Sequence, residues 1–296
     1  MSTKCGLRAT DRLSTSSIQT VDRYLGLSLG GAKSDRTCLT VVDYYRKQEK
    51  AFVVDIFDSI GAEDDLTGDQ VLLSLVEEVS GEVGGRPQSG VKVFAVDAPL
   101  TLPPCLSGCE EGCQGYETCR RTEVKWMRNQ FQKAKAKNSK TKHFTPYGQR
   151  PVDLYFRYKH PEEDLFQDET MGANLAPQAA RMNYLKRHWA SMQLIEVWPK
   201  LTLYYLQKSL RLTRKEVLSY RHLERGAGIR NRILERLAEV SNIFIYERDL
   251  KKFISNISAF DSFLCAWVAM QYDLERVMGF RSDLPLESGW VQLPEL

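Results

Sequence analysis

The pattern of apolar and polar positions in the first hundred residues predicts a mixed β-sheet with one crossover helix. Three β-rich runs at 24–30, 37–45 and 51–57 are joined by short polar turns, which favours an antiparallel meander. Apolar residues then recur at helical spacing from 68 to 83, and a continuous apolar run follows at 91–97. A right-handed crossover through this helix places the 91–97 strand parallel to the first strand.

The second half of the chain predicts mostly helices, with one further strand. The expected elements are a helix at 122–137, a helix at 174–191, a strand at 192–198, two helices between 211 and 240 broken near Gly226, and a helix at 258–278. Ser258 is expected to cap the last helix with its hydroxyl. The alternation of elements therefore indicates an α/β protein.

Composition limits the class of protein. The chain has 296 residues, of which 43% are hydrophobic, so it can bury a substantial core. Its net charge of +3 does not mark it as a nucleic-acid binder, and no apolar run approaches the roughly 20 residues of a membrane span. We expect a polar tail at 1–20, a single domain at 21–296 with an insertion at 101–175, no membrane association and a cytoplasmic location. The oligomeric state is left open.

Three carboxylates occupy comparable places in the predicted elements. Asp97 ends a buried strand, Glu196 lies near the end of another, and Asp261 opens a buried helix. Because a carboxylate in an apolar setting is costly unless a cation neutralises it, their convergence would create a site for Mg²⁺ or Mn²⁺. Such a site suits phosphodiester hydrolysis. The alternative is that each carboxylate caps its own strand or helix.

Five short motifs resemble a known family. They are Gly26-Leu-Ser-Leu-Gly-Gly31, Val96-Asp-Ala-Pro-Leu100, Thr145-Pro-Tyr-Gly-Gln-Arg-Pro-Val-Asp153, Ile195-Glu-Val-Trp-Pro199 and Phe260-Asp-Ser-Phe-Leu-Cys-Ala-Trp267. Together they resemble domain-of-unknown-function family four-two-nine, a group of predicted nucleases similar to the ribonuclease H-like superfamily. The resemblance implies a ribonuclease H-like mixed five-stranded sheet flanked by helices, here carrying a cysteine-rich insertion.

The resemblance also implies roles for individual residues. It places Asp97, Glu196 and Asp261 at the acidic, metal-binding and catalytic positions, whereas Ser28 stands where the first strand usually bears an acid. The resulting hypothesis is a metal-dependent nuclease. A second hypothesis is a non-catalytic module that binds nucleic acid or protein, since a hydroxyl is a weaker metal ligand than a carboxylate. A third is an ATP-dependent phosphotransferase that uses the Gly30-Gly31 turn and Lys33, although that turn is also typical of a plain hairpin.

Four cysteines follow the 91–97 strand at short intervals. Cys105, Cys109, Cys113 and Cys119 lie in a loop with few apolar residues, so thiolates that share one zinc ion are the simplest interpretation. An iron–sulfur cluster, or free and regulatory thiols, remain open alternatives. The other three cysteines, at 5, 38 and 265, are predicted to be a tail thiol and two small buried residues.

A basic stretch links the cysteines to the third motif. Lysines at 133, 135, 137, 140 and 142 are interleaved with aromatic residues, a mixture that suits a nucleic-acid channel but also a solvated loop. Lys142 and Tyr147 are therefore candidate substrate-binding residues, as is Ser28 in the first strand. Arg150, held between two prolines, is a candidate clamp for a phosphate or a carboxylate.

Overall fold

The protein is described here from a computed structural model. The structure describes residues 21–31, 35–81, 90–109, 111–160, 169–173, 175–285 and 289–296. The predicted tail at 1–20, with Cys5, and Lys33 of the turn after the first strand lie outside the described residues.

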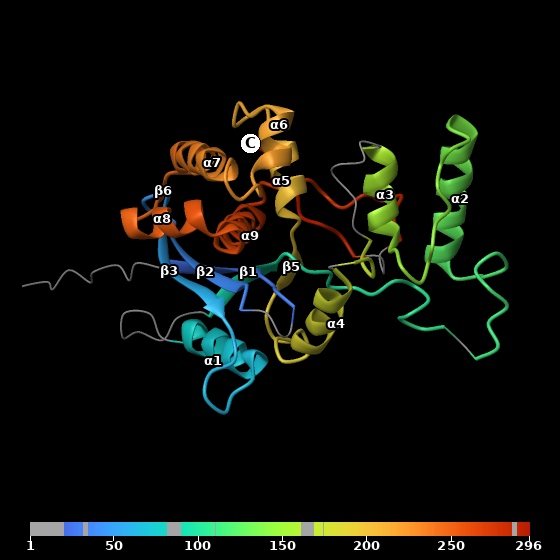
Figure 1. Ribbon diagram of the computed structural model, residues 1–296, viewed down its shortest axis with the longest axis horizontal. Helices are drawn as coiled ribbons and strands as arrows, with labels where there is room; N and C mark the ends of the chain where they lie inside the picture. The colour runs from blue at the N-terminus through green and yellow to red at the C-terminus, as the bar shows by residue number, and fades with distance from the viewer. Residues whose placement is uncertain are drawn as a thin grey trace, which may run out of the picture.

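A mixed six-stranded sheet forms the centre of the described chain (Figure 1), in the order β5-β4-β1-β2-β3-β6. The strands are β1 (Val21–Ser28), β2 (Thr37–Tyr45), β3 (Lys50–Ile60), β4 (Val91–Val96), β5 (Leu194–Glu196) and β6 (Ile243–Phe244). Strand β2 is antiparallel to both of its neighbours, whereas β4 is parallel to β1 and to β5. The meander and the parallel return predicted from the sequence are confirmed.

Helix α1 (Gly68–Ser80) makes the crossover between β3 and β4. It starts at Thr67, whose hydroxyl accepts from the backbone N–H of Gln70 while the Gln70 side chain accepts from the N–H of Thr67. This reciprocal pair satisfies two of the donors that a helix start leaves unpaired. Because β1, β4 and β5 then run in one direction, their carboxyl ends meet at one edge of the sheet.

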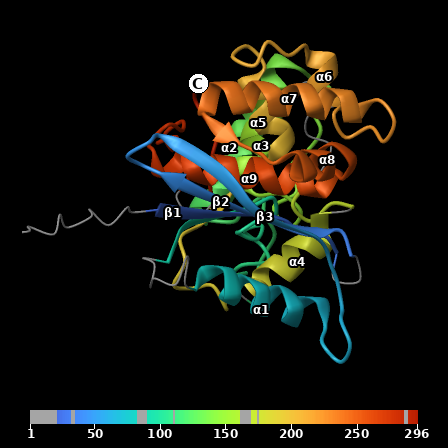
Figure 2. The same ribbon diagram turned by 90° about the vertical axis from the view of Figure 1, so that its left-hand side faces the viewer.

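Helices cover both faces of the sheet (Figures 1 and 2), and eight described helices follow α1 in the chain. Their bounds are α2 (Thr122–Lys137), α3 (Pro151–Lys159), α4 (Leu175–Leu185), α5 (Pro199–Leu206), α6 (Arg214–Ser219), α7 (Gly226–Ser241), α8 (Glu247–Ser255) and α9 (Ile257–Asp273). Helices α1 and α4 lie on one face, and α9 lies directly on the other with α5 to α8 around it.

Strand β1 supplies both layers of the core by simple alternation. Leu25 and Leu27 are fully buried in the cluster on the α1 and α4 face, whereas Tyr24 belongs to the cluster on the α9 face. Gly26 faces α9 as well, and a Cβ atom there would lie 2.1 Å from the backbone nitrogen of Ala266. The missing side chain therefore lets α9 lie against the strand at backbone distance.

A separate apolar cluster joins α2 and α3, which stand beyond the β5 side of the sheet in Figure 1. Its buried members are Val124, Met127, Phe131, Phe144 and Leu154. Because Phe131 and Met127 anchor α2, the helix continues to Lys137 and takes up the first half of the lysine-rich stretch. The predicted helix at 122–137 is confirmed, and the expectation of a loop holds only from 138 onward.

Several predicted boundaries were wrong. Strand β5 has three residues, where the sequence predicted seven, and β6 adds a sixth strand that the pattern did not indicate. Helix α9 begins at Ile257 because the side chain of Asn256, rather than Ser258, accepts from the backbone N–H groups of Ser258 and Ala259. Within the described residues, no single helix is long and apolar enough to cross a membrane, although α8 and α9 together pass by length and composition across a bend of 115°.

Candidate functional site

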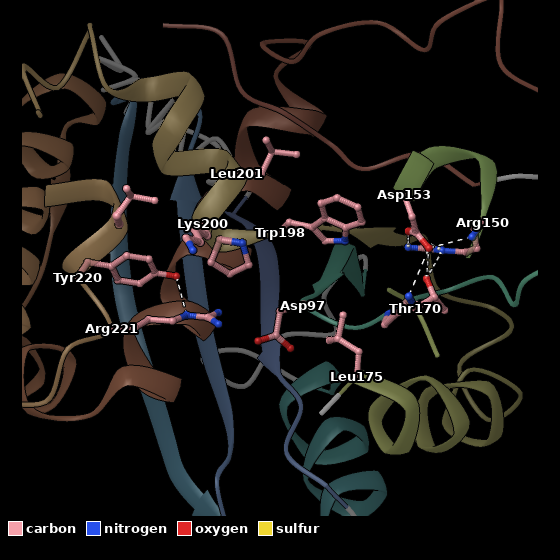
Figure 3. A pocket seen from close by; sticks show the side chains of 13 residues that line it. Asp97, Arg150, Asp153, Thr170, Leu175, Trp198, Lys200, Leu201, Tyr220 and Arg221 are labelled. Carbon is pink, nitrogen blue, oxygen red and sulfur yellow. Dashed lines mark hydrogen bonds and ion pairs between the residues drawn. The ribbon is translucent and has the colours of Figure 1, made fainter. Parts of the chain in front are cut away.

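A cavity of about 220 Å³ opens at the carboxyl ends of β4 and β5 (Figure 3). Its polar lining includes Asp97, Lys200, Tyr220 and Arg221, and Trp198 contributes an aromatic wall. Asp97 follows β4, whereas the other four residues come from the segment between β5 and α7. The cavity therefore combines Asp97 of the sheet edge with the two cations and the phenol of the helical layer, and its lining also includes Arg150, Asp153 and Thr170.

Asp97 is held by the strand beside it. Its Oδ2 accepts from the hydroxyl of Ser28 at 2.7 Å, and its Oδ1 accepts from the backbone N–H of Leu29 at 2.7 Å. Burial, followed by the negative charge of Asp261, raises the pKa of Asp97 to about 6. The hydrogen bond from Ser28 acts in the opposite direction. The two carboxylates are thus close enough to repel one another.

Asp261 lies in the first turns of α9 and is 3% exposed. Its Oδ1 accepts from the Tyr220 hydroxyl at 2.9 Å, and its Oδ2 pairs with the Arg221 guanidinium at 2.7 Å. Arg221 also donates from Nε to the Tyr220 oxygen at 2.8 Å. Burial raises the pKa of Asp261, and the Arg221 charge opposes that effect. In Figure 3 the guanidinium of Arg221 reaches from Tyr220 toward Asp97.

Glu196 lies at the same sheet edge but faces a different set of partners. Nη1 and Nη2 of Arg150 each donate to one of its oxygens at 2.7 Å. The backbone N–H of Leu100 and the indole of Trp198 donate to the same carboxylate at 2.9 Å and 2.8 Å. Four donors fill the acceptor positions of a carboxylate. The described structure therefore does not bring Glu196 together with Asp97 and Asp261 around one point.

Arg150 clamps carboxylates of the protein itself, whereas the sequence predicted a clamp for a phosphate or a carboxylate of a substrate. It is 1% exposed, and besides Glu196 it donates to Asp153 and to the hydroxyls of Thr170 and Thr101. Burial lowers its pKa, but the charges of Asp153 and Glu196 outweigh that effect and raise the pKa above the ordinary value. Because its donors are occupied, Arg150 is not available to bind a substrate phosphate.

The remaining substrate-binding candidates lie elsewhere. Lys142 and Tyr147 are exposed, with 58% of Tyr147 accessible, and neither belongs to the described lining of the cavity. The Gly30 backbone N–H donates to the Thr37 hydroxyl at 3.2 Å, and its carbonyl accepts from the buried Arg181 at 2.8 Å. The turn at Gly30 is thus engaged by the protein, which argues against a phosphate-gripping hairpin.

The predicted metal ligands are the four cysteines that follow β4 and the three carboxylates of the sheet edge and α9. Among the residues that the structure describes, no three or more His, Cys, Asp or Glu side chains are arranged to hold a metal ion. Cys105, Cys109, Cys113 and Cys119 are free thiols, and Cys109 and Cys113 are exposed. Cys38 and Cys265 are fully buried, as predicted. Of the carboxylates, Asp97 and Asp261 alone remain as a pair.

Sequence reasoning missed Lys200, Tyr220 and Arg221. Lys200 directly follows the Ile195–Pro199 motif, so its place one turn beyond a strand end was a usable signal. Tyr220 and Arg221 lie just after α6 in a charged stretch and carry no local signal. Only the packing of that segment against α9 brings them to Asp261.

Comparisons with protein-family models, with curated proteins and with solved structures found no match to this chain. The resemblance drawn from the five short motifs therefore stays a prediction.

Proposed function

We propose that this chain is a divalent-metal-dependent phosphodiester hydrolase and that a nucleic acid is its substrate. The observation that carries the proposal is that Asp97 and Arg221 line the cavity beyond β4 and β5 and that Arg221 pairs with the buried Asp261, whose charge acts on Asp97. Ligands and reacting groups of open α/β sheets are usually found at this edge. The proposed location of the activity is the cytoplasm, a reducing compartment in which cysteine thiols remain unpaired.

The order of the strands supports the ribonuclease H-like part of the proposal. Strands β3, β2, β1, β4 and β5 are neighbours in that order, and β2 alone runs against the others. This is a mixed five-stranded arrangement flanked by helices, to which β6 is added at the β3 edge. In it, Ser28, Asp97 and Asp261 lie close together, which fits the positions that the resemblance assigns to the acids.

The residues present fit one ion rather than a three-carboxylate site. Each oxygen of Asp97 and of Asp261 accepts one hydrogen bond or ion pair, which leaves further lone pairs on both groups. Mg²⁺ is commonly held by one or two carboxylates, with water and substrate phosphate completing its shell. Asp97 and Asp261 would hold such an ion. When bound, it activates water and stabilises the charge on the leaving oxygen.

The other residues of the cavity have roles that follow from their chemistry. Arg221 and Lys200 supply positive charge next to Asp97, which suits the binding of a phosphate group. Tyr220, fully buried, bonds to both Asp261 and Arg221 and so fixes their orientation. Glu196, held by Arg150, accepts from the indole of Trp198 and so positions that ring at the cavity wall, and neither Glu196 nor Arg150 is assigned to the chemistry.

The proposal is tested with labelled single-stranded, double-stranded and hybrid nucleic acids, incubated with the purified chain and Mg²⁺ or Mn²⁺. We expect cleavage of at least one substrate, loss of cleavage on addition of chelator, and loss in Asp97→Asn and Asp261→Asn. Asp283→Asn is the matched control, because Asp283 is a half-exposed surface carboxylate. Absence of cleavage on every substrate, or cleavage that survives Asp97→Asn, would overturn the proposal.

A non-catalytic binding function is the second candidate. It is favoured by Ser28, which places a hydroxyl rather than a third carboxylate beside Asp97, and by Arg221, whose cation already pairs with Asp261. In that case the same nucleic acids are bound without cleavage, and Arg221→Gln weakens the binding. The phosphotransferase hypothesis receives less support, because Thr37 and Arg181 engage the backbone of Gly30.

A further inference from the structure

One loop of the chain gathers four thiols at a distance from the cavity. The loop runs from Pro104 to Arg121 and contains four of the seven cysteines. These are Cys105, Cys109, Cys113 and Cys119. All four are free, the first and last are half-buried, and the middle two are exposed. A loop with this many accessible thiols and no disulfide among them needs a chemical explanation.

The four thiols are electrostatic neighbours. Burial raises the pKa of Cys105, and the charges of Cys109, Cys119 and Cys113 each raise it further. A hydrogen bond with Cys113 is the first cause of the raised pKa of Cys109. Cys109, Cys113 and Cys119 thus lie within electrostatic reach of Cys105, although 14 positions separate Cys105 from Cys119 in the sequence.

Two arginines close the base of the loop. Nη1 of Arg121 donates to the carbonyl of Pro104 at 2.5 Å, so the two ends of the loop meet. Arg128 of α2 donates to the carbonyl of Tyr116 at 3.0 Å and to that of Cys119 at 2.9 Å. The backbone on both sides of the thiols is thus fixed to the body of the protein before any further link is added.

The loop itself has almost no core. The described residues from 106 to 114 are exposed, and Leu106 leaves 50% of its surface accessible. Tyr116 and Cys119 are its only described residues that pack against the apolar cluster of α2 and α3. A segment of this length without buried apolar contacts is stabilised in small proteins by cross-links between side chains.

We propose that Cys105, Cys109, Cys113 and Cys119 together bind one zinc ion, which fixes this loop. The described side chains are not arranged around a single point, so binding requires the exposed Cys109 and Cys113 to turn toward the other two. Each thiol releases one proton to water as its sulfur bonds to the metal, and no electron is transferred. Four thiolates and Zn²⁺ carry two net negative charges.

The test measures metal directly and does not depend on hydrolase activity. The full chain is purified under reducing conditions without chelator, and its metals are determined by elemental analysis. We expect about one zinc per chain, bound tetrahedrally by four sulfurs. Cobalt added to the metal-stripped chain should produce thiolate-to-metal charge-transfer absorption. The variant Cys105→Ser/Cys119→Ser should lose both signals, whereas Ser107→Ala, in the same loop, and Cys5→Ser should keep them.

Three results would overturn the zinc site. They are a zinc content in the wild-type chain no higher than in the double variant, disulfides among these cysteines in protein alkylated before any oxidation, or iron with inorganic sulfide in place of zinc. The cobalt titration of the wild-type chain is independent of whether the double variant folds. Cleavage assays of Asp97→Asn address the cavity alone, so failure of either proposal is recognised separately.

Discussion

The hydroxyl of Ser28 donates a 2.7 Å hydrogen bond to Oδ2 of Asp97. Ser28, which ends β1, and Asp97, which directly follows β4, are thus linked at the carboxyl edge of the sheet. The hydroxyl partly offsets the burial of this carboxylate, because it stabilises the charged form. Ser28, at the position where the resemblance expects an acid, is therefore a hydrogen-bond donor that lowers the pKa of Asp97.

Ser28→Ala should raise the pKa of Asp97 above its value of about 6, because the bond from Ser28 lowers that pKa. We also expect a loss of about 1 kcal/mol in the free energy of unfolding, the typical contribution of one hydrogen bond. Carbon-detected NMR titration of the Asp97 carboxyl measures the first effect and urea unfolding the second. Ser74→Ala, on the exposed side of α1, is the control. An unchanged or lower pKa would contradict the assigned contact.

Asp97→Asn should change how stability depends on pH. The native pKa of Asp97 is about 6 against an ordinary value of 3.8, so the folded state binds the proton more tightly than the unfolded state. The stabilising contribution is complete below the ordinary value and is lost as the pH rises through about 6. At roughly 1.4 kcal/mol per pKa unit, the loss amounts to at most about 3 kcal/mol. The asparagine variant lacks this loss.

The measurement is urea unfolding of both proteins with chelator present, from weakly acidic to weakly alkaline pH. The stability of Asp97→Asn relative to the wild-type chain should increase as the pH rises. A stability difference that is constant over this range would show that the Asp97 carboxyl titrates normally.

Arg150→Met should destabilise the fold by about 3–5 kcal/mol, because it leaves Asp153 and Glu196 buried without their cation. Glu196→Gln should cost less, since Arg150 keeps Asp153 as a partner. Chemical unfolding gives both values. Arg281→Met is the control, because both members of the Arg281–Asp283 pair are half exposed and the change should stay within about 1 kcal/mol. Loss of metal binding in Glu196→Gln at unchanged stability would restore Glu196 as a ligand.

Gly26→Ala should lower the free energy of unfolding by at least about 3 kcal/mol, because the added methyl group would meet backbone atoms, which cannot move aside as a flexible side chain can. The new Cβ atom would lie 2.1 Å from the carbonyl oxygen of Ser262 and equally close to the nitrogen of Ala266, both of them backbone atoms of α9. Gly31→Ala is a matched control, because a Cβ atom there meets nothing within 4 Å. Equal melting temperatures for the two variants would show that α9 does not pack as described.

The candidate site was predictable only where the end of a buried strand or the start of an apolar helix supplied it. Asp97 follows a continuous apolar run, and a carboxylate at the end of a buried parallel strand is a signal that periodicity alone provides. Asp261 was found because it opens the most apolar helix of the chain. Glu196 gave the same signal as Asp97, yet its carboxylate is neutralised by Arg150, which lies 46 positions away. Sequence spacing carries no information about such a partner.

The sequence by itself determined the β1-β2-β3 meander and the parallel return of β4, because their order and direction follow from alternating apolar residues, short turns and one crossover helix. It also determined which acids reach the sheet edge. The tertiary structure decided which of those acids is left facing a cavity. Arg150 and Arg221 are chemically alike, but only Arg150 lies in a sequence motif that suggested a site. Packing buries one between two internal carboxylates and leaves the other half exposed beside Asp97. Because burying an unpaired charge is costly, each arginine pairs with a carboxylate that lies close to it in the folded protein. The local sequence does not show which carboxylate that is.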